Sequence, residues 1–274
     1  MKWTDEAEAA IQKVPFFVRK KVRKRVEKEA AGAGKAQVTL AGVKRTQTRF
    51  LSKMGSEVKG YQVETCFGSG GCPNRVHSGD GLLARIETLL KEADLLSLLK
   101  ERVKGDLKFH HEFRVAIAEC PNACSQPQIK GVGIIAAALP RVTEDPCTGC
   151  GACVTACKEN AIALAGEPEH PEISFDRCLM CGHCITACPS GTLLEGSKGY
   201  RVQLGGRLGR HPRLAMELPG IYTEEEVLAI VEKCVRFFKE KSLHGERFSH
   251  LLTEADFQKM VPCWQPRNSG PHCR

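Results

Sequence analysis

The stretch "VETCFGSGGCPNRV", residues 63–76, holds two cysteines apart on a loop rich in glycine. Cys66 and Cys72 have five residues between them, most of which are glycine or small. A second pair follows in "AECPNACSQPQ", residues 118–128, where Cys120 and Cys124 have three residues between them. The two pairs are too far apart for a single zinc finger, so they predict one buried cluster that draws its ligands from two distant loops.

Length and composition predict an ordinary globular chain. The chain has 274 residues with 42% hydrophobic content, enough for one large domain or two to three small ones with a packed core. The opening "MKWTDEAEAA" has acids where a signal peptide needs an apolar stretch, and no run is long enough to span a membrane. We therefore expect a cytoplasmic protein, in which the 15 cysteines are reduced and serve as metal ligands rather than as disulfides.

The formal net charge of +8 counts no thiolates, so part of the basic excess would balance anionic metal clusters. The rest is concentrated in "KVPFFVRKKVRKRVEKE", residues 13–29. Its valines at 14, 18, 22 and 26 recur every fourth residue, as a buried stripe does. This spacing favours a solvated basic face on a helix over a docking face for nucleic acid or an acidic redox partner, and nucleic acid is not an expected partner.

The remaining pattern alternates helices and strands. Thr4 is a plausible N-cap, and Pro15 divides the helical pattern of residues 1–45 into two short helices. Residues 31–40 are expected to end the helices and lead into a strand, residues 113–120 and 131–139 to be strands, and residues 199–214 to form a strand and a glycine-rich turn. Helices are expected in residues 79–105 (one or a pair), 223–241 with Thr223 as N-cap, and 245–260. The tail from residue 263 has too much proline and glycine for regular structure, and Cys234, Cys263 and Cys273 belong to no motif.

Two cysteine runs lie between these elements, "CTGCGACVTACKEN" at 147–160 and "CLMCGHCITACPS" at 178–190. The spacing C-x2-C-x2-C-x3-C, written twice, is the signature of a two-cluster ferredoxin, in which the fourth cysteine of each run ligates the other cluster. Two structural zinc sites are the alternative, but four closely spaced cysteines per run argue against them. The expected ligand sets are Cys147, Cys150, Cys153 and Cys188 for one 4Fe-4S cluster, and Cys178, Cys181, Cys184 and Cys157 for the second.

The pattern C-x5-C followed at a distance by C-x3-C resembles the cluster site of the sulfite and nitrite reductase family. The resemblance implies that Cys66, Cys72, Cys120 and Cys124 bind a third 4Fe-4S cluster coupled to siroheme, with Cys124 as the ligand shared with the haem iron. "CPNAC" matches the Cys-Pro-Asn-x-Cys turn of the family and adds Asn122 to the cofactor-binding residues. The cysteine-rich insert after the second pair is similar to that of the small anaerobic sulfite reductase subunits.

The same resemblance suggests residues that bind anions. "VQLGGRLGRHPRL", residues 202–214, looks like the glycine-rich segment near the siroheme carboxylates, so Arg207 and Arg210 are candidates for pairing with them. Arg114, with Arg45 or Arg49, is a candidate for the oxyanion. The family tends to have lysines on both sides of a phenylalanine here, whereas this chain has Glu112 and Arg114. Either Glu112 points away from the anion, or the substrate is not sulfite.

The N-terminal stretch "WTDEAEAAIQKVPFFVRKKVRKRVEKEA" resembles the small helical domain that ends one of the subunits of light-independent protochlorophyllide reductase. We therefore expect an α+β chain with four parts. A helical domain covers residues 1–50, and a mixed domain of the sulfite reductase type covers residues 51–145 and 197–262. A ferredoxin-like insert covers residues 146–196, and residues 263–274 form an irregular tail.

The function implied by these resemblances is a siroheme-dependent oxidoreductase that reduces a small oxyanion such as sulfite, with the insert relaying electrons. The alternative is a non-catalytic electron-transfer subunit with three clusters and no siroheme turnover, and a tetrapyrrole-binding protein is a weaker third reading. An electron-donor protein or subunit is implied in either of the first two cases. Since siroheme reductases use two related halves, a chain with about one half is expected to pair with itself or with another subunit.

Overall fold

The computed structural model describes the backbone of residues 1–264, together with their side chains except those of residues 51–54 and 263. The chain divides into two compact units. The first comprises Met1–Val58 and Val103–His110, and the second comprises Lys59–Arg102 and the chain from His111 onward. Helices and strands are mixed, as expected for an α+β chain. Cys273 and most of the predicted irregular tail lie outside the described residues.

The first unit is mainly helical. It contains β1 (Lys2–Trp3), α1 (Asp5–Gln12), α2 (Phe16–Gly32), β2 (Gln37–Val38) and α3 (Leu40–Glu57), with β1 and β2 paired in parallel. Thr4 caps α1 by accepting a hydrogen bond from the Ala7 backbone at 3.4 Å, and Pro15 stands just before α2. Two helices separated at Pro15 are therefore confirmed.

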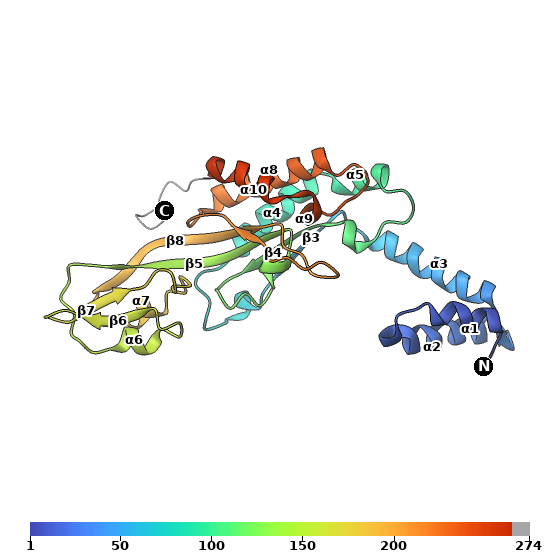
Figure 1. The fold of residues 1–274 in the computed structure, drawn as a ribbon, viewed down its shortest axis with the longest axis horizontal. Coiled ribbons are helices and arrows are strands. Elements are labelled where there is room, and N and C mark those ends of the chain that lie inside the picture. The colour runs from blue at the N-terminus through green and yellow to red at the C-terminus, as the bar shows by residue number, and fades with distance from the viewer. Residues whose placement is uncertain (265–274) are drawn as a thin grey trace. The chain divides into compact units, whose positions relative to one another are not determined.

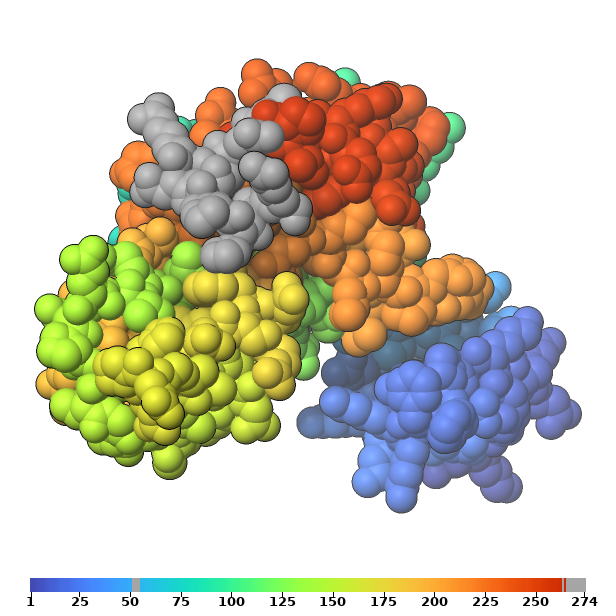
Figure 2. Space-filling model, turned by 60° about the vertical axis from the view of Figure 1, so that its left-hand side comes forward, coloured from blue at the N-terminus to red at the C-terminus, as the bar shows by residue number. Residues whose placement is uncertain are grey.

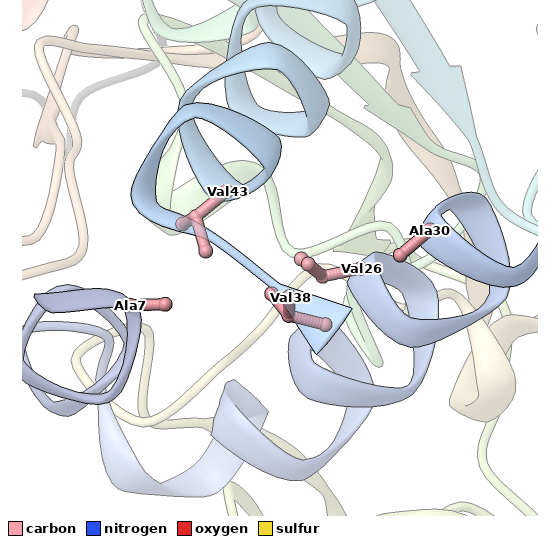
Figure 3. Packing of buried hydrophobic residues seen from close by; sticks show 5 residues of the cluster. All are labelled: Ala7, Val26, Ala30, Val38 and Val43. Carbon is pink, nitrogen blue, oxygen red and sulfur yellow. The ribbon is translucent and has the colours of Figure 1, made fainter. Parts of the chain in front are cut away.

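The predicted stripe of valines is buried only in part, because Val26 is buried whereas Val14, Val18 and Val22 are half-buried, and Val14 precedes α2. The core of the unit is formed by buried residues from α1, α2, β2 and α3, as Figure 3 shows: Ala7, Val26, Ala30, Val38 and Val43. Val22 packs against them while half-buried. Helix α3 was not predicted, because "LAGVKRTQTRFLSKMGSE" mixes glycine and threonine with few regularly spaced apolar residues. Thr39 starts it by accepting from the Gly42 backbone at 3.3 Å.

The second unit is built on a five-stranded sheet with the order β3-β4-β5-β8-β9. Strands β3 and β4 are parallel, as are β4 and β5, whereas β8 and β9 join the sheet antiparallel. The connection from β3 to β4 runs through two helices, which is the crossover that a parallel pair needs. The bounds are β3 (Tyr61–Thr65), α4 (Asp80–Glu92), α5 (Leu95–Arg102), β4 (Phe113–Ala118), β5 (Val132–Val142), β8 (Leu193–Leu204) and β9 (Met216–Glu217).

Helices cover one side of this sheet in Figure 1. The last of them are α8 (Glu224–Lys241), α9 (Phe248–Leu251) and α10 (Glu254–Met260). Phe113 of β4 packs on Phe238 of α8 and on Phe248 of α9, with ring centroids 5.5 and 5.2 Å apart. Cys234 points into the same core and is 1% exposed, so it is explained as an apolar core residue.

One prediction about these helices is wrong. A single helix was expected over residues 245–260, but the structure has two, because Thr253 forms a second start signal. The Thr253 hydroxyl accepts from the Asp256 backbone, while the Asp256 carboxylate accepts from the Thr253 backbone. This capping box separates α9 from α10. The N-cap predicted at Thr223 for α8 is confirmed, and it too is part of a capping box.

The segment between β5 and β8 folds as a small lobe of its own, coloured green to yellow in Figure 2. It contains α6 (Ala152–Ala156), the antiparallel pair β6 (Ile162–Ala165) and β7 (His170–Ile173), and α7 (His183–Ala187). Its two ends meet, because Val142 is opposite Leu193 and the Thr143 backbone donates to the Thr192 carbonyl at 2.8 Å. None of the described helices has the length and hydropathy of a membrane span.

The packing of α4 gives a test of this fold. Leu82 is fully buried on the inner side of α4, so Leu82→Ala should lower the free energy of unfolding by about 2–5 kcal/mol, through lost burial and the cavity left behind. Leu243→Ala in the same unit is the matched control, since that side chain is 63% exposed and should change stability by less than about 0.5 kcal/mol. Chemical denaturation followed by circular dichroism measures both, and equal effects would contradict the packing.

Candidate functional site

The two distant cysteine pairs are brought together by strand order. Cys66 follows β3 and Cys120 follows β4, and these strands are parallel neighbours with Thr65 opposite Ile117. Parallel neighbours end at the same edge of a sheet, so both loops begin side by side. The Cys66 backbone donates to the Ile117 carbonyl at 3.2 Å, and the Glu119 backbone donates to the Cys66 Sγ at 3.3 Å. The sheet thus brings the two cysteine pairs together in space, although they lie far apart in the sequence.

The electrostatics of Cys120 show that the other three thiols lie within range of it. Burial raises the pKa of Cys120, the backbone N–H of Asn122 lowers it, and the thiols of Cys66, Cys72 and Cys124 each raise it. Cys120 is buried, whereas Cys124 and the neighbouring Asn122 are exposed. The structure therefore brings these four cysteines together, and Cys124 is the member that faces outward.

The turn that carries Cys120 and Cys124 is held in an unusual backbone conformation. Ala123 has φ of 53°, in the left-handed region that non-glycine residues rarely adopt. Just after it, the Ser125 hydroxyl donates to the Ile117 carbonyl at 2.8 Å and ties the turn back to β4. Strained conformations persist where surrounding contacts over-determine them, and they cluster at functional sites.

The two cysteine runs of the insert form locally equivalent loops. Gly149 and Met180 occupy the same place in their runs and have φ of 68° and 58°, and Gly151 and Gly182 have φ of 70° and 74°. In each run a backbone N–H reaches the first thiol at 3.4 Å, from Gly149 to Cys147 and from Met180 to Cys178. A short helix then follows in both runs. The repeat seen in the sequence is thus a repeat in backbone conformation.

Interactions between the thiols sort the insert cysteines into the two expected groups. Burial raises the pKa of Cys153, and Cys188 and Cys147 raise it further, while Cys188 also acts on Cys150. Burial raises the pKa of Cys184 to about 12, with further increases from Cys178, Cys181 and Cys157. The fourth cysteine of each run therefore lies with the other run. Among the described residues, no group of three or more histidine, cysteine or acidic side chains has the arrangement of a site for a single metal ion.

Further backbone N–H groups point at the fourth cysteines. Ala161 donates to Cys157 at 3.3 Å and Leu193 donates to Cys188 at 3.5 Å, and the hydroxyl of Ser190 lies 3.5 Å from Cys188. Hydrogen bonds to ligating sulfurs are one of the means by which proteins tune iron-sulfur clusters. The donor set, thiols in fours with N–H groups directed at them, fits 4Fe-4S clusters.

One cysteine group of the insert faces the turn after β4. A cavity of about 60 Å³ is lined by Cys120, Pro121 and Asn122 on one side, and by Cys157, Cys178, Cys181 and Cys184 on the other. The Ala138 backbone of β5 donates to the Met180 carbonyl at 2.8 Å and fixes the insert against the sheet here. The group that contains Cys147 does not line this cavity.

A group of arginines lies elsewhere in the same unit. Burial lowers the pKa of Arg247, and the charge of Arg114 lowers it further. Burial also lowers the pKa of His250, with smaller contributions from Arg207, Arg247 and Arg213. Because charges act on one another only at short range, the arginines at 114, 207, 213 and 247 form one cationic group around His250. Neither Arg213 nor Arg247 was singled out from the sequence, since isolated arginines carry no spacing signal.

The arginines predicted to pair with carboxylates differ in their surroundings. Arg207 donates through Nε to the His211 carbonyl at 2.9 Å and through a terminal nitrogen to the Ser249 carbonyl at 2.8 Å. Arg213 donates to the carbonyls of Gly205, Ser249 and Leu252 and so fixes the same loop. Arg210 is exposed. Arg207 thus belongs to the cationic group, while Arg210 stands out in solvent.

The three residues proposed for the oxyanion are not all in one unit. Arg114 is the second residue of β4, six residues before Cys120, a separation of about 20 Å along an extended strand. The structure therefore places Arg114 and the four-cysteine group toward opposite ends of β4. Arg45 and Arg49 belong to the first unit, where both are exposed on α3 and Arg49 lies 3.6 Å from Glu29.

Glu112 is turned toward backbone. It is 7% exposed and accepts a hydrogen bond from the Lys59 backbone at 2.9 Å. Burial raises the pKa of Glu112, while the backbone N–H groups of Lys59 and Gly60 and the charge of Arg114 lower it. The Glu112 carboxylate is therefore hydrogen-bonded to the backbone just before β3.

Comparisons with known proteins show the family of the chain. A family model described as "Nitrite and sulphite reductase 4Fe-4S domain" matches residues 59–267, more than half of the chain. The chain belongs to this family. The model "Proto-chlorophyllide reductase 57 kD subunit" matches residues 3–46, so both resemblances predicted from the sequence are confirmed.

Among curated proteins, the chain is 30% identical over 192 residues to the coenzyme F420-dependent sulfite reductase of Methanocaldococcus jannaschii, covering 69% of this chain and 29% of that protein. It is 30% identical over 105 residues to one of the subunits of the anaerobic sulfite reductase of Salmonella typhimurium, covering 38% of this chain and 26% of that protein. The chain thus spans less than a third of these relatives.

Two further likenesses are more local or more distant. One of the subunits of the light-independent protochlorophyllide reductase of Chlorobium chlorochromatii is 62% identical over 40 residues, which is 15% of this chain and 7% of that protein. Among solved structures, dissimilatory sulfite reductase I aligns with a TM-score of 0.48 and 15% identity, over 77% of this chain and 53% of that one.

The thiol environments predict an order of chemical reactivity in the iron-free protein. The Ala152 backbone N–H lowers the pKa of Cys150, which is exposed, whereas burial raises the pKa of Cys234 to about 12. Since the thiolate is the nucleophile, Cys150 should be alkylated by iodoacetamide at lower pH than Cys153 and Cys184, whose pKa is raised by burial, and Cys234 should stay unmodified until unfolding. Peptide mass spectrometry over a pH series measures this, and early labelling of Cys234 would contradict its burial.

Proposed function

We propose that this chain is the part of a sulfite or nitrite reductase type oxidoreductase that binds siroheme and iron-sulfur clusters and reduces a small oxyanion such as sulfite. The observation that carries the proposal is the four-cysteine group at the ends of β3 and β4, in a chain that belongs to this family. Its exposed member, Cys124, is the thiol available to a second metal group beyond the cluster.

The three groups of cysteines are the proposed ligands of three 4Fe-4S clusters. Bound clusters supply one-electron transfer, and siroheme supplies the iron at which an oxyanion is reduced. The ligand sets are Cys147, Cys150, Cys153 and Cys188; Cys178, Cys181, Cys184 and Cys157; and Cys66, Cys72, Cys120 and Cys124.

The insert is the proposed electron relay. Support comes from the cavity that the Cys157, Cys178, Cys181 and Cys184 group shares with the turn from Cys120 to Asn122, since that group is the one nearest the third set of ligands. The Cys147 group has no part in this cavity and contains the exposed Cys150, so it is suited to receive electrons from a donor. The proposed electron donor is a separate protein or subunit.

The cationic group supplies the proposed anion contacts. The charge of Arg114 acts on Arg247, and Arg207 and Arg247 both act on His250, so a ligand carrying negative charge would relieve the repulsion between these arginines. Such a ligand is either the oxyanion or a carboxylate of siroheme. Arg210 is a further proposed contact for a siroheme carboxylate, and Asn122 is a proposed cofactor contact two residues before Cys124. We further propose a cytoplasmic protein that pairs with itself or with another subunit.

The role of Cys124 is tested by Cys124→Ser. Serine keeps the size of the side chain but removes the thiolate, so the siroheme absorption of anaerobically purified protein should be lost, while the signals of the two insert clusters stay. Absorption spectra, extraction of tetrapyrrole and counts of iron and sulfide measure this. A normal siroheme spectrum in the variant would contradict the axial assignment, and a wild-type chain with iron for three clusters but no tetrapyrrole would overturn siroheme binding.

The anion site is tested by Arg114→Gln, with Arg85→Gln as the matched control. Arg85 lies on the surface against Glu225 at 2.9 Å. Losing a charge-assisted contact to the anion should raise the KM for sulfite about 10- to 100-fold in assays with a reduced viologen dye, whereas the control should stay within about twofold. If siroheme content falls instead and KM holds, Arg114 binds a siroheme carboxylate. Unchanged KM and siroheme content would exclude both roles.

A further inference from the structure

Glu119 is the buried acid nearest the third cysteine group. It stands between the end of β4 and Cys120, and only 5% of it is exposed. A carboxylate in so enclosed a place is costly unless its oxygens are hydrogen-bonded.

Three hydrogen bonds connect Glu119 to the loop of residues 66–79. Its backbone N–H donates to the Cys66 Sγ at 3.3 Å, and its carbonyl accepts from the Val76 backbone at 2.8 Å. Its Oε1 accepts from the Gly79 backbone at 2.9 Å. One residue therefore binds both ends of the loop that carries Cys66 and Cys72.

The loop leaves room for this carboxylate. A β-carbon at Gly68, between the two loop cysteines, would overlap Glu119 Oε2 and lie 2.7 Å from its carboxyl carbon. Gly68 does not have the left-handed backbone that glycine usually serves, so space is the reason for glycine here. A β-carbon at Gly79 would lie 3.6 Å from Oε1.

The second carboxylate oxygen has no hydrogen-bond partner. Oε2 is buried, and no donor within the described part of the chain reaches it. Unsatisfied buried polar atoms are rare in native proteins and need a reason. Here the orphan oxygen lies against the loop that presents Cys66 and Cys72.

We propose that Glu119 is a positioning residue for the third cluster: it fixes the loop of Cys66 and Cys72, and its carboxylate lowers the reduction potential of the group those cysteines hold. The inference rests on the proposed cluster there. Negative charge close to a cluster disfavours adding an electron, and the net charge and hydrogen bonds around a cluster set its potential. No contact of Glu119 with substrate is implied.

The charge effect is tested with Glu119→Gln in the whole protein. Glutamine keeps the oxygen that accepts from Gly79 but removes the charge, so the midpoint potential of the third cluster should become more positive. The two insert clusters serve as internal references and should not move. Glu112→Gln is the matched control, because Glu112 is similarly buried and also accepts from backbone. Redox titration followed by electron paramagnetic resonance measures all three clusters, and an unchanged third potential in Glu119→Gln would overturn the charge effect.

The positioning effect has a readout that needs no cluster. In iron-free protein, Glu119→Ala should speed amide hydrogen exchange in residues 66–79 by about tenfold or more, because a carboxylate hydrogen bond is lost, whereas Glu119→Gln should stay near wild type. Glu112→Ala should speed exchange around residues 59–60 only. Equal exchange in Glu119→Ala and wild type would overturn the positioning role. If the wild-type protein holds iron for only two clusters, the third cluster of the proposed function is excluded. The exchange comparison still decides in that case whether Glu119 holds the loop.

Discussion

The parallel pairing of β3 with β4 is the constraint on which the candidate site depends. Neither cysteine pair is a complete ligand set, and 47 residues separate Cys72 from Cys120. The helices α4 and α5 return the chain so that both strands end at one edge, and only then do four thiols share one place. Helices α4 and α5 matter to the chemistry for this reason. Without the crossover that they form, the two cysteine pairs would lie apart even though none of the cysteines had changed.

Much of the cysteine arrangement could be predicted because thiol spacing is a local signal. The doubled run indicates which fourth cysteine crosses to which group, and the interactions of Cys188 and Cys157 agree with it. The family resemblance was likewise readable from two short motifs. Strands β4 and β5 were also recognised, because each has several apolar residues between turn signals.

Other parts of the structure had no local signal. Helix α3 is weakly helical in sequence and is stabilised by packing of Val43 in the core of its unit. The break before α10 depends on Thr253 and Asp256, a pair hidden inside an otherwise helical pattern. Arg247 belongs to the cationic group because it lies within range of the charge of Arg114. Arg114 precedes it by 133 residues in the sequence, and no spacing rule connects the two. Glu112 was weighed as a neighbour of the anion, but its partner proved to be backbone, which only the fold reveals.

The hairpin of β5 and β8 has a consequence for how such a chain is assembled over evolution. The insert leaves and re-enters the sheet at the paired residues Val142 and Leu193, so its ends are already adjacent before it folds. A hairpin held by its own ladder tolerates exchange of its loop, because the strand register does not depend on what lies between. The lobe between β5 and β8, for which we propose an electron-relay role, is therefore a replaceable module, and a short turn in its place would leave the sheet as it is.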